Sequence, residues 1–203
     1  GLAMESLEKD WTVHPVLHMD LNTEKYDTEA SLENKLELTL KQWEAEYGHN
    51  PDEYSVATRF EGVIRRAAKK MGQKVVILID EYDKPMLQAI TNSELQTKFR
   101  NTLKAFYGAL KSCDGFIHFA MLTGVTKFSK VSVFSDLNNL RDISMVNQYA
   151  EICGISDAEL HQYFDEDIHS LADKLSIDYT KACGLLKENY DGYHFCYNSI
   201  GMY

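Results

Sequence analysis

The stretch VVILIDEYDKP, residues 75–85, constrains the fold of this chain more than any other. It begins with five consecutive aliphatic residues, 75–79, and shows no alternation with polar residues. Such a run is typical of a strand that is buried on both faces of a parallel sheet. The run ends in Asp80 and Glu81 and, after one aromatic residue, Asp83. We therefore predict a buried strand whose carboxyl end carries three carboxylates.

Two further apolar segments predict neighbouring strands. Residues 15–21 form a short strand that ends near Asp20, and the segment GFIHFAMLTG ends at Thr123. Amphipathic patterns predict helices over residues 31–48, 54–72 and 93–112, with Gly48 and Gly72 as stops and Ser93 as an N-cap. Strands that alternate with helices indicate a parallel α/β sheet, and right-handed crossovers place the helices on its faces.

The pattern changes after Gly124. The following segment, up to Ser144, is polar and aromatic, which suits a structured loop. From Ser156 onward the chain is mostly helical, and this serine precedes an acidic first turn, as helix N-caps do. We therefore divide the chain into an α/β core over residues 1–155 and a helical appendix or lid subdomain over residues 156–203.

Composition excludes several classes of protein. The formal net charge is −10, which opposes binding of a nucleic-acid backbone by the bulk of the surface. The four cysteines stand far apart without a C-x-x-C pair, so we expect free thiols in a reducing compartment rather than a zinc site. No apolar run approaches the ~20 residues that span a membrane, and no signal-peptide pattern opens the chain. We expect a cytoplasmic protein without membrane or nucleic-acid partners.

In an open parallel sheet, the ligand crevice lies beyond the carboxyl ends of the strands. If the three strands are adjacent, Asp20, Asp80 and Thr123 all face that crevice. An aliphatic strand that ends in Asp-Glu is the Walker B arrangement of P-loop ATPases. In it, Asp80 holds Mg²⁺ through water, Glu81 orients and deprotonates the attacking water, and Thr123 is placed to sense the γ-phosphate.

Other interpretations of the same residues stay open. The strand could simply end in an acidic turn or helix cap. The chain could also be a non-catalytic binding or regulatory module that kept the fold. Asp83 could be a second metal ligand, although a turn or helix-start position is the commoner role of such a residue. A metal-dependent hydrolase or nuclease would instead use Asp20, Asp80, Glu81 and Asp83 directly as ligands.

Longer motifs point to a family. The segments VVILIDEYDKPML, FAMLTGVTKFSKVSVFSDLNNLRDIS and NYDGYHF, together with GLAMESLEKDWTVHPVLHMDLN, resemble the predicted AAA-ATPase-like family of bacterial proteins, in order and over nearly the whole chain. The resemblance implies a P-loop NTPase-type sheet, with ATP and Mg²⁺ as cofactors. It also implies that Asp80 and Glu81 are the Walker B pair and that Thr123 is the polar sensor. Full-length relatives often carry a nuclease-like domain after this one.

One departure from the family pattern matters. Family members carry a glycine-rich phosphate-binding loop before the segment where this chain starts, whereas no G-x-x-x-x-G-K-[ST] motif occurs in these 203 residues. We therefore expect a partial P-loop NTPase fold, truncated at its N-terminus, that by itself binds no ATP or Mg²⁺ and is inactive. The missing strand would leave the edge of the strand at residues 116–122 open. We predict that a second copy, or the segment 125–150, covers this edge.

Overall fold

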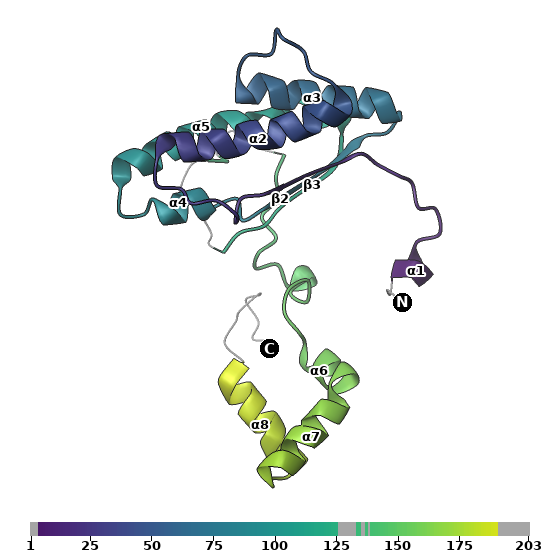
Figure 1. Cartoon of the computed structure of the whole chain (residues 1–203). Coiled ribbons are helices and arrows are strands. Elements are labelled where there is room, and N and C mark those ends of the chain that lie inside the picture. The colour runs from purple at the N-terminus through teal and green to yellow at the C-terminus, as the bar shows by residue number, and fades with distance from the viewer. Residues whose placement is uncertain (1–3, 126–132, 135–136, 138, 191–203) are drawn as a thin grey trace. The chain divides into compact units, whose positions relative to one another are not determined.

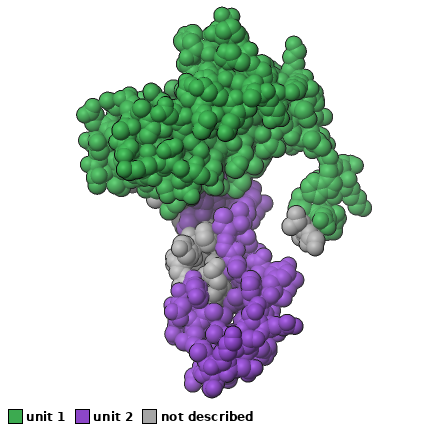
Figure 2. Space-filling view, viewed as in Figure 1, with its two compact units in different colours: residues 1–140 green, residues 141–203 purple. Residues whose placement is uncertain are grey.

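The structure is a computed structural model that describes residues 4–125, 133–134, 137 and 139–190. The chain divides into two compact units, residues 1–140 and residues 141–203, which Figure 2 shows in separate colours. No helix in the described ranges is long and apolar enough to cross a lipid bilayer.

A three-stranded parallel sheet forms the centre of the first unit. Its strands are β1 (Val16–Asp20), β2 (Val75–Asp80) and β3 (Ile117–Leu122), and they lie in the order β1-β2-β3 (Figure 1). Both pairs, β1 with β2 and β2 with β3, are parallel. The predicted α/β fold with a parallel sheet is therefore confirmed, and the aliphatic run is its central strand.

Three long helices cover one face of this sheet. They are α2 (Glu29–Tyr47), α3 (Val56–Met71) and α5 (Ser93–Ser112), and all lie on the same side of the strands in Figure 1. The shorter helices are α1 (Met4–Leu7) before β1 and α4 (Lys84–Gln88) directly after β2. Right-handed crossovers between strands added in sequence order keep placing helices on the same side, which explains this one-sided arrangement.

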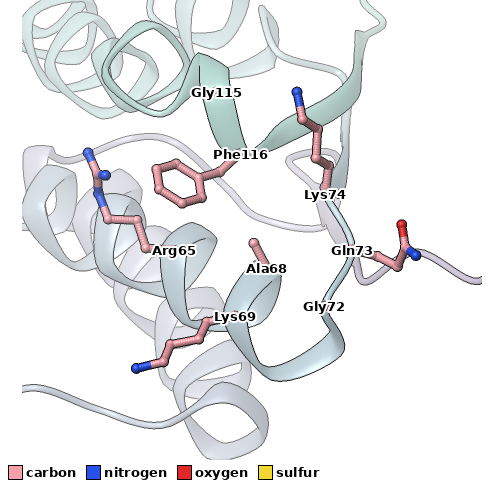
Figure 3. Close-up of a pocket in the computed structure, with 8 residues that line it drawn as sticks. All are labelled: Arg65, Ala68, Lys69, Gly72, Gln73, Lys74, Gly115 and Phe116. Atoms are coloured by element: carbon pink, nitrogen blue, oxygen red, sulfur yellow. The ribbon is translucent and has the colours of Figure 1, made fainter.

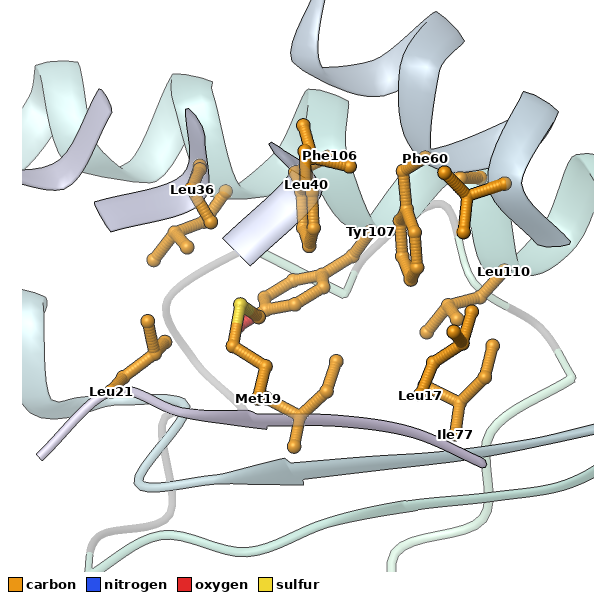
Figure 4. Packing of buried hydrophobic residues seen from close by; sticks show 14 of the residues in the cluster. Leu17, Met19, Leu21, Leu36, Leu40, Phe60, Ile77, Phe106, Tyr107 and Leu110 are labelled. Atoms are coloured by element: carbon orange, nitrogen blue, oxygen red, sulfur yellow. The ribbon is translucent and has the colours of Figure 1, made fainter. Parts of the chain in front are cut away.

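The core lies between these helices and the strands. Phe60 of α3 stacks on Phe106 of α5, with ring centroids 4.4 Å apart, and on Trp43 of α2, at 5.4 Å. Figure 4 shows Phe60 and Phe106, together with Tyr107, above the strand residues Leu17 and Ile77, which are fully buried. The three helices therefore hold one another and the sheet through the same aromatic side chains.

The other face of the sheet is more open than the aliphatic run predicts. Burial alternates along β1 and β2, because alternate side chains point away from the helices. On that far face Val16 is 49% exposed and Phe119 is 51% exposed, while Val76 and Leu78 are half-buried. The expectation that β2 is buried on both faces is wrong within the described residues, because all three long helices cover the same face.

The outer edge of β3 has no strand partner among the described residues. The segment that we expect to cover this edge includes residues 126–132, 135–136 and 138, which lie outside the described residues. Coverage of the edge by this segment or by a second copy therefore stays a prediction.

Both ends of α3 follow local sequence signals. A capping box links Ser55 and Thr58 at the start of α3, and Gly72 ends this helix in the left-handed conformation, at φ 66°. The N-cap of α5, however, is Asn92 rather than the predicted Ser93. The Asn92 side chain accepts a hydrogen bond from the Leu95 N–H, and an asparagine serves this purpose as well as a serine.

The described residues of the second unit contain three α-helices, α6 (Asp157–Tyr163), α7 (Asp165–Leu175) and α8 (Tyr179–Tyr190), after the short 3-10 helix η3 (Asn147–Tyr149). Ser156 caps α6 in a capping box with Glu159, as its position before an acidic turn predicts. A small core joins the three helices through Leu160, Ile168, Ala172 and Ala182. The structure separates the two units after residue 140, whereas the sequence places the start of the helical part at residue 156.

The cysteines of the described residues are free thiols. Cys113 is buried, Cys153 is exposed and Cys183 is half-buried, and none of them forms a disulfide. Cys196 lies outside the described residues.

A buried ion pair connects α2 and α3. The Arg59 guanidinium donates two hydrogen bonds of 2.8 Å to the carboxylate of Glu44 and one of 3.0 Å to Glu37. The side chains of Arg59 and Glu44 are only 9% and 7% exposed. These hydrogen bonds hold the pKa of Glu44 below its usual value, although burial acts in the opposite direction.

We predict that this pair makes the stability of the first unit depend on pH. A lowered pKa in the folded state stabilises the protein above the unfolded pKa, near 4.5, and this contribution is lost as the pH falls through the folded pKa. Glu44→Gln mimics the protonated residue and should lower the free energy of unfolding by about 1–3 kcal/mol at neutral pH. Urea denaturation across the pH range should show this difference from the wild type shrinking as the pH falls through the folded pKa of Glu44.

Glu33→Gln is the matched control, because Glu33 is exposed on the same helix. It should change the free energy of unfolding little at any pH. A difference in the free energy of unfolding between the wild type and Glu44→Gln that stays constant at every acidic pH at which the protein still folds would contradict the assignment.

Candidate functional site

The register of the sheet brings the predicted site residues together. Asp20 and Asp80 are direct partners across β1 and β2. On the other side of β2, Ile79 pairs with Leu122, and the Thr123 N–H donates to the Ile79 carbonyl at 2.9 Å. The residues Asp20, Asp80 and Thr123 therefore stand side by side at the carboxyl ends of three adjacent strands.

Asp80 is the centre of this arrangement. Its Oδ1 atom accepts a hydrogen bond from the Thr123 hydroxyl and another, at 3.1 Å, from the backbone N–H of Glu81. Asp80 is exposed to solvent, and none of the described residues hydrogen bonds to its Oδ2 atom. The carboxylate is thus oriented by two donors on one oxygen and remains accessible at the other.

Glu81 has an unusual backbone conformation. Its φ angle is +55°, in the left-handed region that glycine and asparagine favour and that costs other residues free energy. Its side chain is half-buried and has no hydrogen-bond partner among the described residues. Backbone strain of this kind gathers at functional sites. No glycine or asparagine signals it here, so the sequence could not have predicted it.

Asp83 occupies a different environment from the other acidic residues. It is only 1% exposed, and it stands at the N-cap position of α4 without capping that helix through its side chain. Its Oδ1 atom instead accepts a hydrogen bond from the backbone N–H of Val125, at 3.3 Å. Asp83 therefore connects the end of β2 to the loop that follows β3.

The carboxylates do not form a direct metal cage. Nowhere in the described part of the chain do three or more His, Cys, Asp or Glu side chains gather closely enough to hold a metal ion. At the end of β1, the Asp20 Oδ1 atom accepts a hydrogen bond from the Asn22 N–H at 2.7 Å. The arrangement gives no support to a hydrolase that binds metal through all four carboxylates.

A groove of about 590 Å³ lies at the opposite end of the sheet. It is lined by Lys74, which precedes β2, and by Phe116, which precedes β3, together with Arg65 and Lys69 of α3. Figure 3 shows the Phe116 ring inside the groove and the lysine side chains at its rim. Because the groove lies at the amino ends of the strands, it is separate from the carboxylates.

Comparison with known proteins gives two matches. Residues 1–134 match the family described as "Predicted AAA-ATPase". The chain is also 37% identical, over 163 residues, to the "Uncharacterized protein in vnfD 5'region" of Azotobacter chroococcum mcd 1. That match covers 80% of this chain but 32% of the relative, so the chain spans about a third of the relative's length. No solved structure matches the chain.

The left-handed conformation of Glu81 yields a stability prediction. In the middle of a helix or strand, a glycine makes the protein less stable than an alanine does, by about 0.5–1 kcal/mol. At φ +55° we expect the reverse, with Glu81→Gly more stable than Glu81→Ala by about 1 kcal/mol in urea denaturation, because only alanine carries the steric cost. Glu94, in the first turn of α5, provides the control pair, and there Ala should be more stable than Gly. The same order at both positions would refute the strain at Glu81.

Proposed function

The chain belongs to the predicted AAA-ATPase family, and on that premise we propose that it forms the Walker B and sensor part of a domain that binds and hydrolyses ATP. The observation that carries the proposal is the hydrogen bond from the Thr123 hydroxyl to Asp80, made between the ends of adjacent parallel strands. Glu81, which follows Asp80 directly, supplies a second carboxylate at the same sheet edge.

Each residue has a separate role in this proposal. The Glu81 carboxylate accepts a proton from the attacking water, a task that suits a half-exposed side chain without a described hydrogen-bond partner. Thr123 holds the Asp80 carboxylate in one orientation through its hydroxyl. We propose that the same hydroxyl, which lies at a strand end next to the carboxylates, also responds to the terminal phosphate.

The residues present fit Mg²⁺ held through water. This ion prefers oxygen ligands, keeps several of its waters and takes few protein carboxylates. Asp80 provides an exposed carboxylate whose Oδ2 atom is not engaged by any described residue. When bound, Mg²⁺ would neutralise charge on the phosphates during transfer. This fit supports Asp80 as the residue that holds the ion through its waters.

A non-catalytic module of the same fold is the second candidate. It is favoured by one observation: Asp83, one of the three carboxylates after β2, is buried at the N-cap position of α4, which is a structural place for an acidic residue. ATP hydrolysis requires in addition a G-x-x-x-x-G-K-[ST] motif, whose backbone N–H groups and lysine cradle the phosphates. The two candidates differ in their prediction for a protein in which a phosphate-binding loop precedes this segment. The ATPase candidate then predicts ATP hydrolysis, and the non-catalytic candidate predicts none.

We predict that Glu81→Gln separates binding from hydrolysis. In a version of the protein in which a phosphate-binding loop precedes residue 1, this change should leave the Kd for ATP nearly unaltered. It should lower kcat by at least about a hundredfold, as loss of a general base does. Glu94→Gln, on the exposed first turn of α5, is the control and should retain full turnover. Near-normal turnover in Glu81→Gln would remove Glu81 from the proposed role.

The 203-residue chain itself should bind Mg-ATP too weakly to measure. It has no phosphate-binding motif, and its net charge of −10 repels the nucleotide. Isothermal titration with Mg-ATP at about 0.1 M salt tests this. A Kd in the low micromolar range would show that other residues of the chain rebuild the phosphate cradle.

A further inference from the structure

The loop after β3 is held against the end of β2 by a short series of hydrogen bonds. The Thr123 N–H donates to the Ile79 carbonyl, and the Tyr82 N–H donates to the Thr123 carbonyl, both at 2.9 Å. These backbone bonds continue the β2–β3 pairing beyond the strands. The bond from the Val125 N–H to Asp83 Oδ1 follows immediately along the chain.

Asp83 makes this connection with a carboxylate that is almost fully buried. An aspartate at an N-cap usually accepts a hydrogen bond from its own helix. Here the Asp83 carbonyl accepts from the Leu87 N–H at 2.9 Å, while the side chain does not cap α4. A buried carboxylate destabilises the folded protein unless it is hydrogen-bonded. For Asp83 such a bond comes from the backbone N–H of Val125, which lies far along the chain.

Gly124 makes the close approach of the carboxylate to the loop feasible. A Cβ atom at this position would lie 2.6 Å from Asp83 Oδ1 and 2.8 Å from a ring carbon of Tyr82. Both distances are shorter than real Cβ contacts. The aromatic ring of Tyr82 is itself packed edge-to-face against Phe134, with centroids 5.0 Å apart. A side chain at position 124 would therefore displace the loop from Asp83.

We propose that Asp83 is the positioning residue that keeps the Thr123 hydroxyl on Asp80, through its hydrogen bond to the loop two residues further on. The inference rests on the proposed function for its catalytic consequence but not for the hydrogen bond itself. It gives Asp83 a role distinct from metal ligation, because Oδ1 is engaged by Val125 and the side chain is buried.

Amide hydrogen exchange of the 203-residue chain tests the positioning directly. Asp83→Ala removes the acceptor and should speed exchange of the Tyr82 and Thr123 amides on the order of tenfold, the effect of losing one hydrogen bond. Asp83→Asn retains an Oδ1 acceptor and should stay near the wild-type rates. The Leu21 amide is the internal reference, because it donates to the Asp80 carbonyl on the other side of β2 and should not change.

A second variant separates positioning from general loss of stability. Asn92→Ala removes the N-cap of α5, which destabilises the fold without touching the loop after β3. This variant should not speed amide hydrogen exchange at Tyr82 or Thr123 relative to the exchange at Leu21. Unchanged Tyr82 and Thr123 rates in Asp83→Ala would overturn the proposal. If Asp83→Ala sped exchange of the Leu21 amide as much as that of Tyr82 and Thr123, the proposal would also be overturned, because equal acceleration at all three amides indicates global unfolding.

Turnover then tests the catalytic consequence in a version that carries a phosphate-binding loop. Asp83→Ala should lower kcat about tenfold with little change in KM, and Asp83→Asn should restore most of it. Local acceleration of exchange without a fall in kcat would overturn the positioning role in catalysis. If the wild type hydrolyses no ATP at all, the proposed function fails, and the exchange rates alone then decide whether Asp83 positions the loop.

Discussion

Hydrogen bonding of β2 to a parallel neighbour on each side is the constraint on which the candidate site depends. Asp80 stands at the end of this central strand, so residues from β1 and from β3 both reach it. The pairing places Asp20 on one side and Thr123 on the other without any long loop to position them. The aromatic layer of α2, α3 and α5 packs in one hydrophobic core with the strands and so supports the sheet from one face. The geometry of the site follows from the packing of the sheet.

Much of this arrangement could be predicted from the sequence. The uninterrupted aliphatic run of β2 and the apolar segment before Thr123 identify two strands. The apolar spacing of Leu36, Leu40 and Trp43 identifies α2. Because carboxyl ends of parallel strands meet at one edge, the proximity of Asp80 and Thr123 also follows from sequence order. These features depend on residues that are close in sequence or on a general rule of sheet topology.

Other features depend on contacts that a sequence pattern does not contain. The N-cap of α5 is Asn92 instead of Ser93, because adjacent polar residues compete for the same position. The open face of the sheet arises because α2, α3 and α5 pack on the other face (Figure 1), which an aliphatic run in the sequence does not indicate. The left-handed backbone of Glu81 occurs in a residue type that rarely adopts it. The partner of Asp83 lies about forty residues further along the chain, and Gly124, visible in the sequence, acquires its meaning only from their proximity.

The sequential order of the strands has a consequence for synthesis of the protein. Each strand pairs with the one made before it, and α2 and α3 leave the ribosome before β2, whose inner face they cover. The N-terminal part of the first unit can therefore assemble as it emerges. Of the three strands, β3 is made last. In a nascent chain that ends before residue 117, β1 can already pair with β2 and bring Asp20 beside Asp80, but Thr123, whose hydroxyl donates to Asp80, has not yet been made. During synthesis the two carboxylates can therefore meet before the hydroxyl that orients Asp80 has been made.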